Sequence, residues 1–488
     1  MNNSSSPTRV RYSILAMLCV MAMITYLDRA ANGIAKNDIM AAVDRPVEDF
    51  FWVLTAFQIA YACFEIPTGY LGDRFGPRKT ILRLVIWWTC FMLLNPLIGL
   101  IFPPSITVFG ASIFIAFLLL IFAEFMFGVG EAGAFPNITR ALYNWFPSSQ
   151  RGVAQGTIWL SARFMGGFTP LTWVLLVELG GLSWRQAFWL FAAFAAVWCV
   201  VFYMWFRNHP HEHPATNQAE RDLIDVGRAP HADHYGVPWR KIFTSRNVIA
   251  LCAMYMVTNF NWYFIMYYLP GTFKGQFPIW NQSDSGKIML ALLGGAPMLV
   301  GMAGCLIGGV LTDRYIRRTG DRKWGRRIFA MIGYGMAGFC YLTAAQFTDS
   351  LWVFAGCIMA VGFFNDWIMG PSWAACQDVG RRYSAIVSGT MNMVGNLGAV
   401  LGIQVTGRIL KAYTVNGNVE SQGYVVLFTI YGLVYFLGVG AWMLIDASKP
   451  IQFDETSPQH SEQTDPNWVP PTQLDSEQTD YDENERPR

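Results

Sequence analysis

Charged side chains are scarce in this sequence. Asp, Glu, Lys and Arg make up 14% of its 488 residues, whereas soluble domains carry about 25%. Hydrophobic side chains make up 53%, and long apolar runs recur from Tyr12 to Ile445. A large soluble enzyme is therefore excluded. We expect an all-α membrane protein in a lipid bilayer, because a helix satisfies its own backbone polar groups there.

Cysteine and histidine are also few, and their positions exclude several kinds of site. The nine cysteines contain no Cys-x-x-Cys pair, which argues against a disulfide framework or a zinc site. Five of the six histidines lie between Arg207 and Arg246, and none lies in an apolar run. Any proton relay must therefore use carboxylates. His209, His211 and His213 alternate, but no group of acidic or cysteine partners clusters with them, which favours a solvated linker over a metal site.

Several function classes are missing their usual signatures. The net charge is +2, and no nucleic-acid-binding pattern is visible. No nucleophile–base or metal-ligand constellation appears, so we expect neither an enzyme nor a cofactor. The first apolar run is not followed by a small-residue cleavage site, so we interpret it as a membrane span and not as a signal peptide.

The apolar runs predict twelve membrane spans. They cover residues 12–34, 49–71, 80–101, 106–135, 152–179, 185–206, 248–270, 288–311, 328–347, 351–375, 384–411 and 422–446. Lys and Arg concentrate in the loops on one side, and the positive-inside rule then places both termini in the cytoplasm. We expect a multi-pass protein of a bacterial inner membrane.

The chain divides into two similar halves. Gly69-Tyr-Leu-Gly-Asp73-Arg74 closes the second span, and Gly309-Val-Leu-Thr-Asp313-Arg314 closes the eighth. Such repeats are typical of transporters whose site lies between the halves at the membrane midplane. The predicted parts are an N-terminal six-helix bundle over 1–206, a cytoplasmic linker over 207–247, a C-terminal six-helix bundle over 248–446 and a polar, disordered tail over 447–488.

An acid and a base stand side by side in the first span, in Tyr26-Leu27-Asp28-Arg29. Each costs about 2.5–3.5 kcal/mol at the centre of a membrane helix, and such residues usually mark a substrate or ion path. The alternative is that the hydrophobic part of the helix ends before Asp28. Only about fifteen residues would then remain after Tyr12, whereas a span needs about 20. We therefore expect the pair inside the membrane.

Two motifs carry a family resemblance. Gly69-x-x-x-Asp73-Arg74-x-Gly76-x-Arg78-Lys79 is similar to the loop signature of the major facilitator superfamily. Its charges can make contacts between helix ends, so we expect Asp73, Arg74 and Arg78, with Asp313 and Arg314 in the repeat, to gate the transporter. The alternative is that they only set the topology.

The second motif narrows the resemblance. Gly128-Val-Gly130-Glu131-Ala-Gly-Ala-Phe-Pro136, followed by Asn144-Trp-Phe-Pro147, resembles the anion:cation symporter family, whose members include hexuronate, galactonate and organic-anion transporters. Further similar segments begin at Tyr26, Tyr61, Trp262, Pro371 and Asn392, and the resemblance covers residues 12–446. It implies the major facilitator fold and proton-coupled symport of a small organic anion, a sugar acid such as a hexuronate or aldonate.

The resemblance also implies roles for three residues. Arg29 is expected to hold the substrate carboxylate, and its planar fork suits that contact. Asp28 and Glu131 are expected to couple ion movement, because burial disfavours a charged carboxylate and lets such a group exchange protons near neutral pH. For Glu131 the alternative is a structural hydrogen bond between closely packed glycines.

The sequence departs from the family pattern at three positions. Glu124 stands where an arginine is common, two turns before Glu131 on one helix face, and Arg163 stands where relatives have an uncharged residue. We hypothesise that the positive charge has moved to the fifth span, so that Arg163 pairs with Glu124 or Glu131 or binds the anion. Glu124 near an aqueous edge is the alternative. Glu65 stands where glutamine is commoner in the family. It is either another titrating group or the partner in an interhelical hydrogen bond.

The remaining candidates are aromatic side chains that could flank a sugar-like ring and amide or hydroxyl groups that could bind its hydroxyls. Aromatic residues in spans often only pack, and Asp366 has no role in the pattern. The full set of predicted substrate-binding residues is Tyr26, Arg29, Tyr61, Arg163, Trp262, Tyr263, Ser372, Trp373, Gln377, Asn392 and Asn396. The predicted proton-coupling residues are Asp28, Glu124 and Glu131.

Three alternatives stay open at this point. The excess of buried acids over Arg29 and Arg163 also suits a neutral or cationic solute. The acidic tail is compatible with a membrane sensor that transports nothing. Sodium can replace the proton as coupling ion at an oxygen-rich site. We expect the chain to act as a monomer.

Overall fold

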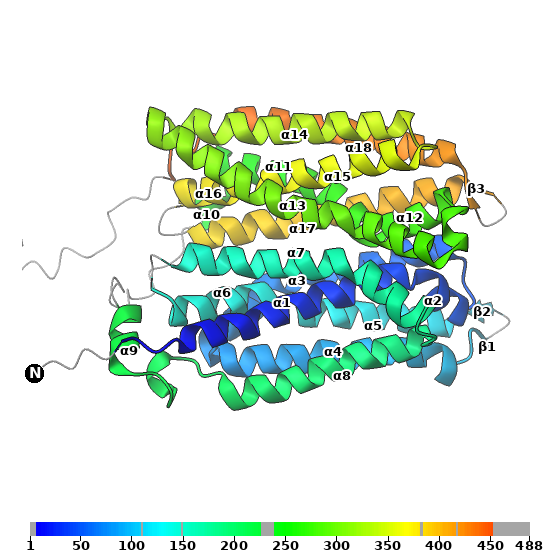
Figure 1. The fold of residues 1–488 in the computed structure, drawn as a ribbon, viewed down its shortest axis with the longest axis horizontal. Helices are drawn as coiled ribbons and strands as arrows, with labels where there is room; N and C mark the ends of the chain where they lie inside the picture. The colour runs from blue at the N-terminus through cyan, green and yellow to red at the C-terminus, as the bar shows by residue number, and fades with distance from the viewer. Residues whose placement is uncertain are drawn as a thin grey trace, which may run out of the picture. The chain divides into compact units, whose positions relative to one another are not determined.

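The structure is a computed structural model that describes residues 6–108, 111–147, 150–225, 239–380, 384–415 and 418–451. The described part contains twelve helices that are long and apolar enough to cross a membrane. They run side by side (Figure 1), and the prediction of an all-α membrane protein with twelve spans is confirmed. Most of the predicted disordered tail, from residue 452 onward, lies outside the described residues.

The first six spans, called the first half here, lie within residues 10–205. They are α1 (Val10–Ile34), α3 (Phe50–Phe75), α4 (Pro77–Ile101), α5 with α6 (Ile115–Glu131 and Ala134–Trp145), α7 (Arg151–Trp173) and α8 (Trp184–Trp205). The second half holds α11 (Arg246–Tyr267), α13 (Asp284–Thr319), α14 (Arg322–Gln346), α15 with α16 (Leu351–Trp367 and Met369–Gly380), α17 (Ser384–Ala412) and α18 (Ser421–Leu444).

Short elements mark the two ends of the helical bundle. One end, called the α9 end, carries α9 (Gln218–Asp225) and α10 (Trp239–Phe243) (Figure 1). The other, called the hairpin end, carries α2 (Lys36–Ala42), α12 (Leu269–Gln276) and two antiparallel strand pairs (Figure 1). The pairs are β1 (Ile106–Val108) with β2 (Ala111–Ile113), and β3 (Thr414–Val415) with β4 (Asn418–Val419).

The structure corrects the predicted fourth span, 106–135. Its first residues form the β1–β2 hairpin, and the helix begins only at Ile115. At the other end the helix bends at a turn over Ala132 and Gly133 and continues as α6. Pro136 does not stop it, because it lies in the first turn of α6, where a missing N–H costs nothing. An apolar run alone therefore misplaced both ends.

Close approach of small residues joins the halves. A side chain on Gly295 of α13 would collide with the backbone of Gly167 in α7, and one on Gly407 of α17 would collide with Phe51 of α3. At the hairpin end, Lys411 Nζ lies 2.6 Å from Asp49 Oδ1, and Lys274 pairs with Glu178. Packing and charge thus join the two halves at this end.

The segment between the halves is more than a solvated linker. Glu220 of α9 is fully buried and accepts hydrogen bonds from Thr8 Oγ1 (2.5 Å), from the backbone N–H groups of Val10 and Arg11 (both 3.2 Å) and from Arg11 Nη1 (3.0 Å). The carboxylate therefore satisfies N–H groups at the start of α1, which have no partner within the helix. Its negative charge also interacts favourably with the positive end of the α1 helix dipole.

Replacing this carboxylate should loosen the start of α1. Glu220→Ala leaves Arg11 and two backbone N–H groups without their acceptor, which costs about 1–3 kcal/mol for each buried group left unsatisfied. We expect a clearly lower unfolding temperature for the detergent-purified protein. Asp222→Ala, an exposed acid on the same helix, is the control and should change little; equal effects would contradict the capping role.

Candidate functional site

The charged pair of the first span lies inside the helical bundle. Asp28 and Arg29 are 1% and 4% exposed, and both lie within α1. Glu131 of α5 is fully buried. Arg29 Nε donates to Glu131 Oε2 at 2.5 Å, so the ion pair joins two helices of the first half.

Aromatic rings cover the guanidinium of Arg29. Its carbon lies 4.5 Å from the centre of the Tyr61 ring and 5.2 Å from that of Phe57, both on α3. A desolvated arginine over an aromatic face gains about 2 kcal/mol. The rings therefore hold the cation in place without using its hydrogen-bond donors.

Several polar atoms of this cluster are buried without a partner. Among the described residues, none accepts from Arg29 Nη2, and none bonds Glu131 Oε1 or either carboxylate oxygen of Asp28. A buried unsatisfied group costs about 1–3 kcal/mol. Donor and acceptor atoms left open at one place are what a site for an anion and a proton requires.

Glu124 is bound differently from the sequence-based hypothesis. It is buried and accepts from Asn32 Nδ2 at 3.0 Å and from Asn95 Nδ2. These amides belong to α1 and α4, so Glu124 connects three helices of the first half. Sequence analysis missed both asparagines, although each is a polar residue inside an apolar run.

The hypothesis that Arg163 pairs with Glu124 or Glu131 is wrong. Arg163 of α7 instead forms a two-pronged ion pair with Asp366 of α15, with Nε–Oδ2 at 3.0 Å and Nη2–Oδ1 at 3.1 Å. The reason is that α7 packs against the second half. The sequence held one signal for this contact. Asp366 is the one acid inside the predicted tenth span, and a buried acid needs a positive partner.

Glu65 also forms a buried polar contact between the halves. It accepts from Asn392 Nδ2 at 2.5 Å and Asn396 Nδ2 at 3.4 Å, both on α17. Gln58 Nε2 of α3 donates to Asn396 Oδ1 at 2.8 Å and to the Tyr263 hydroxyl at 3.3 Å. The two asparagines share a helix face as predicted, and that face meets Glu65. Of the two readings of Glu65, the interhelical hydrogen bond is present.

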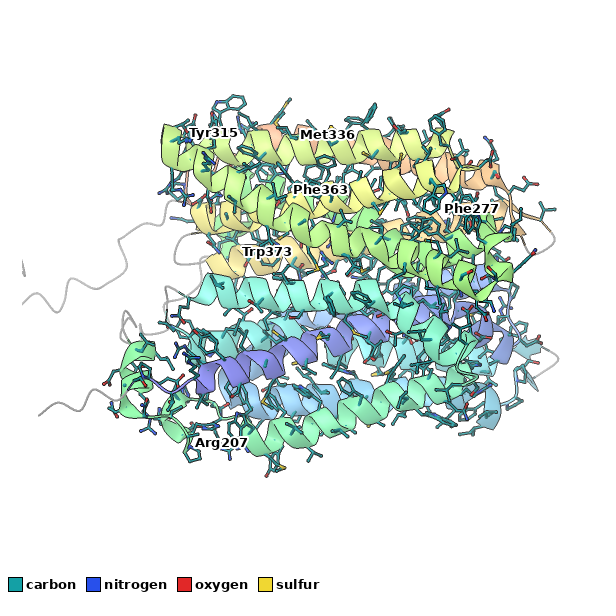
Figure 2. All side chains as sticks on the ribbon, in the orientation of Figure 1. Arg207, Phe277, Tyr315, Met336, Phe363 and Trp373 are labelled. Atoms are coloured by element: carbon teal, nitrogen blue, oxygen red, sulfur yellow. The ribbon has the colours of Figure 1, made fainter. Side chains whose placement is uncertain are left out.

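The other predicted substrate-binding residues are spread along the bundle. Tyr26 and Trp262 contact Arg163. Trp373 of α16 lies between the halves (Figure 2), with its ring 6.2 Å from that of Trp159. Ser372 is fully buried and donates to the carbonyl of Ile368 at 2.8 Å.

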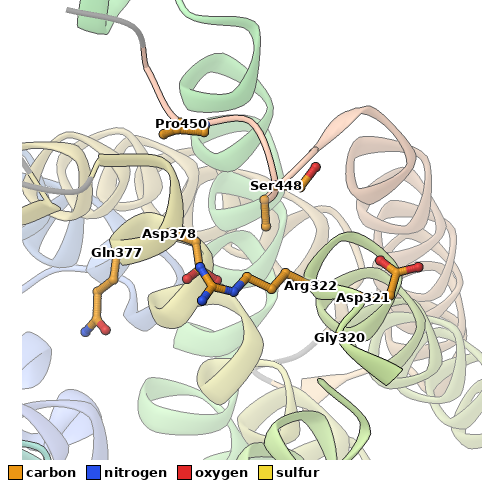
Figure 3. A pocket seen from close by; sticks show the side chains of 8 residues that line it. Gly320, Asp321, Arg322, Gln377, Asp378, Ser448 and Pro450 are labelled. Carbon is orange, nitrogen blue, oxygen red and sulfur yellow. The ribbon is translucent and has the colours of Figure 1, made fainter. Parts of the chain in front are cut away.

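Gln377 lies away from the charged cluster. It is exposed and lines a pocket of about 300 Å³ at the α9 end together with Asp378 and Arg322 (Figure 3). Since Gln377 is at the end of the bundle, it is not brought together with Arg29.

The predicted gating residues make contacts within their own halves. Arg78 Nη2 donates to the carbonyl of Tyr203 at 2.6 Å. Arg326, which the sequence did not single out, donates to Asp313 and Asp378 at 3.1 Å each. Arg74 lies over the ring of Phe75, and Arg314 is exposed. The side chain of Asp73 is outside the described part of the structure.

Comparison with known proteins identifies the family. The model of the Major Facilitator Superfamily matches residues 18–403. The chain belongs to the major facilitator superfamily. It is therefore an integral, multi-pass membrane transporter and not an enzyme, as the sequence predicted.

Curated relatives are transporters of small acids. The probable sulfoacetate transporter SauU of Cupriavidus necator is 28% identical, over 89% of this chain and 93% of the relative. The probable galactarate/D-glucarate transporter GudP of Bacillus subtilis is 27% identical, over 86% and 89%. The D-galactonate transporter of Escherichia coli O6:H1 is 24% identical, over 90% and 97%. These relatives agree with the predicted anion transporter family.

Solved structures share the fold. A D-xylose-proton symporter aligns with a TM-score of 0.66 at 12% identity, over 90% of this chain and 98% of that one. The superfamily member described here thus has the predicted major facilitator fold.

The contact between Glu65 and α17 yields a test at this site. Glu65→Ala removes the acceptor of two side-chain amides between the halves and should lower the free energy of unfolding by about 1–3 kcal/mol. Glu65→Gln keeps one acceptor oxygen and should lose less. Chemical denaturation of the purified variants measures both. An alanine variant as stable as the unchanged protein would show that these bonds contribute nothing.

Proposed function

We propose that this transporter is a proton-coupled symporter of a small organic anion, a sugar acid such as a hexuronate, aldonate or aldarate. The observation that carries the proposal is the cluster of Arg29, Asp28 and Glu131, in which one arginine donor and three carboxylate oxygens are buried and have no partner among the described residues. The names of the relatives support the substrate class, since galactarate, D-glucarate and D-galactonate are all sugar acids.

Arg29 is the proposed anion ligand. Its Nη2 is buried and has no acceptor among the described residues, and Tyr61 fixes the plane of its guanidinium. A carboxylate can approach that edge of the fork and accept a charge-assisted hydrogen bond. The excess of acids around Arg29 does not require a cationic solute, because acids that take up protons no longer repel an anion.

Coupling follows from competition for one cation. When Glu131 is ionised, it occupies Arg29 Nε at 2.5 Å. A proton on Glu131 weakens that pair, so a substrate carboxylate can take its place on the guanidinium. Proton and anion then favour each other's binding, which is the linkage that symport requires. Asp28 and Glu124 are further carboxyl groups in the same half that can take part in proton transfer.

We also propose ligands for the substrate hydroxyls and an orientation of the protein in the membrane. Asn396 and Tyr263 offer polar groups for hydroxyls, and Tyr61 and Tyr263 can flank the carbon chain. We place the α9 end in the cytoplasm, because the basic loops gather there, and the chain acts as a monomer in a bacterial inner membrane.

Uptake into proteoliposomes tests this function. Wild-type protein should accumulate at least one of galactarate, D-glucarate, D-galactonate and D-glucuronate when the outside is acidic, and should not accumulate glucose. Arg29→Lys should lower uptake at low substrate roughly 10- to 100-fold, since it loses a hydrogen bond to a charged group worth about 1.5–3 kcal/mol.

Arg318→Lys, an exposed position, is the matched control and should transport normally. Sugar-acid uptake that survives unchanged in Arg29→Lys removes Arg29 from the site. Uptake that follows a sodium gradient and ignores the pH gradient refutes proton coupling.

Glu131→Gln separates coupling from binding. The amide mimics a permanently protonated carboxyl, so Arg29 stays available but the side chain at position 131 can no longer take up or release a proton. Accumulation driven by a pH gradient should fail, whereas exchange of internal for external substrate should persist. Both are measured with radiolabelled substrate in the same vesicles. Unchanged accumulation would place the coupling proton on another residue.

A further inference from the structure

The ion pair between Arg163 and Asp366 plays no part in the proposed transport mechanism. Both side chains are buried, at 9% and 1% exposure, and the pair connects α7 of the first half with α15 of the second. Among the described residues, Asp366 is the one buried charged side chain in the second half. Its neutralisation therefore comes from the other half of the molecule.

Arg163 has its donors engaged within the protein. Nε and Nη2 bind Asp366, and Nη1 donates to the Tyr26 hydroxyl at 2.9 Å. This differs from Arg29, whose Nη2 has no acceptor among the described residues. Each guanidinium nitrogen of Arg163 already has a partner in the protein, so the structure favours Arg29 as the anion ligand.

The same guanidinium contacts one aromatic side chain from each half. Its carbon lies 3.8 Å from the centre of the Trp262 ring on α11, and its Nη1 donates a hydrogen bond to the Tyr26 hydroxyl on α1. Tyr26 precedes Arg29 by three residues, so the two lie one helical turn apart. Trp262 is followed by Tyr263, which contacts Gln58 and Asn396.

Asp366 also accepts a hydrogen bond within the second half. Asn365 Nδ2 donates to Asp366 Oδ1 at 3.2 Å, and the Tyr435 hydroxyl of α18 donates to Asn365 Oδ1 at 2.8 Å. A continuous set of hydrogen bonds thus runs from Tyr435 through Asp366 and Arg163 to Tyr26. Such a chain fixes the position and plane of the guanidinium.

We propose that Arg163 is a positioning residue: anchored by Asp366, it fixes the positions of Tyr26 and Trp262, which we take as aromatic side chains lining the substrate site. It acts on the substrate through these two rings and does not bind the anion itself. This inference rests on the proposed function, because it assumes that the substrate site surrounds Arg29.

Asp366→Asn distinguishes positioning from direct anion binding. If Arg163 positions the rings, loss of its charged anchor loosens them, and KM for the transported sugar acid should rise about 5- to 10-fold with little change in maximal rate. If Arg163 were an anion ligand that Asp366 masks, the same variant would free it and KM would fall. A lower or unchanged KM overturns the proposal.

Arg163→Lys provides a second variant that keeps the charge pair. Lysine can still pair with Asp366 but loses the fork and the planar stacking on Trp262. KM should rise roughly tenfold, the size expected for a lost desolvated cation–π contact. The matched control is Glu178→Gln, which disturbs another ion pair between the halves and should leave KM unchanged.

A double-mutant cycle keeps the test independent of the substrate. Arg163→Lys and Trp262→Phe should be non-additive, both in KM and in the unfolding temperature of the purified protein, because each removes the same contact. Strict additivity in unfolding temperature overturns the contact whichever solute is carried. Absence of wild-type sugar-acid uptake refutes the proposed function alone, whereas wild-type uptake with additive KM effects refutes the positioning role alone.

Discussion

The buried ion pair between Arg29 and Glu131 is the interaction on which the rest of the site depends. A charge without a partner inside the bundle is costly, and an arginine cannot lose its charge by deprotonation, so Arg29 needs a carboxylate beside it. Glu131 supplies only one oxygen, at 2.5 Å from Nε, and the Tyr61 ring covers the cation. The arginine is thus stabilised but keeps a donor open, which is the condition for exchanging one anionic partner for another.

The other buried acids are each given a separate partner. Glu124 receives two asparagines within the first half, Glu65 receives two from the second half, and Asp366 receives Arg163. Amide donors lower the cost of burying a carboxylate without adding charge. Among the described residues, the buried carboxylate oxygens that have no hydrogen-bond partner all belong to Asp28 and Glu131.

The contacts between the halves combine apolar packing with a few polar groups. Gly167 and Gly295 let α7 and α13 approach closely, while Asp49 with Lys411 joins the halves at the hairpin end. Ion pairs and hydrogen bonds break and re-form more readily than a side chain moves through a packed core. An interface of this kind suits a protein whose two halves must change their relative position to move a solute.

The sequence by itself determined the twelve helices and the burial of Asp28 and Arg29. An apolar run of sufficient length must satisfy its backbone internally in a bilayer, whatever its neighbours are. That argument is local, so it needs no tertiary structure, and it failed at the fourth span, where the run before Ile115 formed a hairpin and the helix continued past residue 135 as α6.

The tertiary structure alone decided which buried side chains pair with one another. Asp366 lies 203 residues from Arg163, and Asn392 lies 327 residues from Glu65. Membrane helices are apolar almost all round, so their sequences do not indicate which face meets which neighbour. Arg163 therefore could not be assigned to Asp366 from the sequence, since only the packing of α7 against the second half brings the two together.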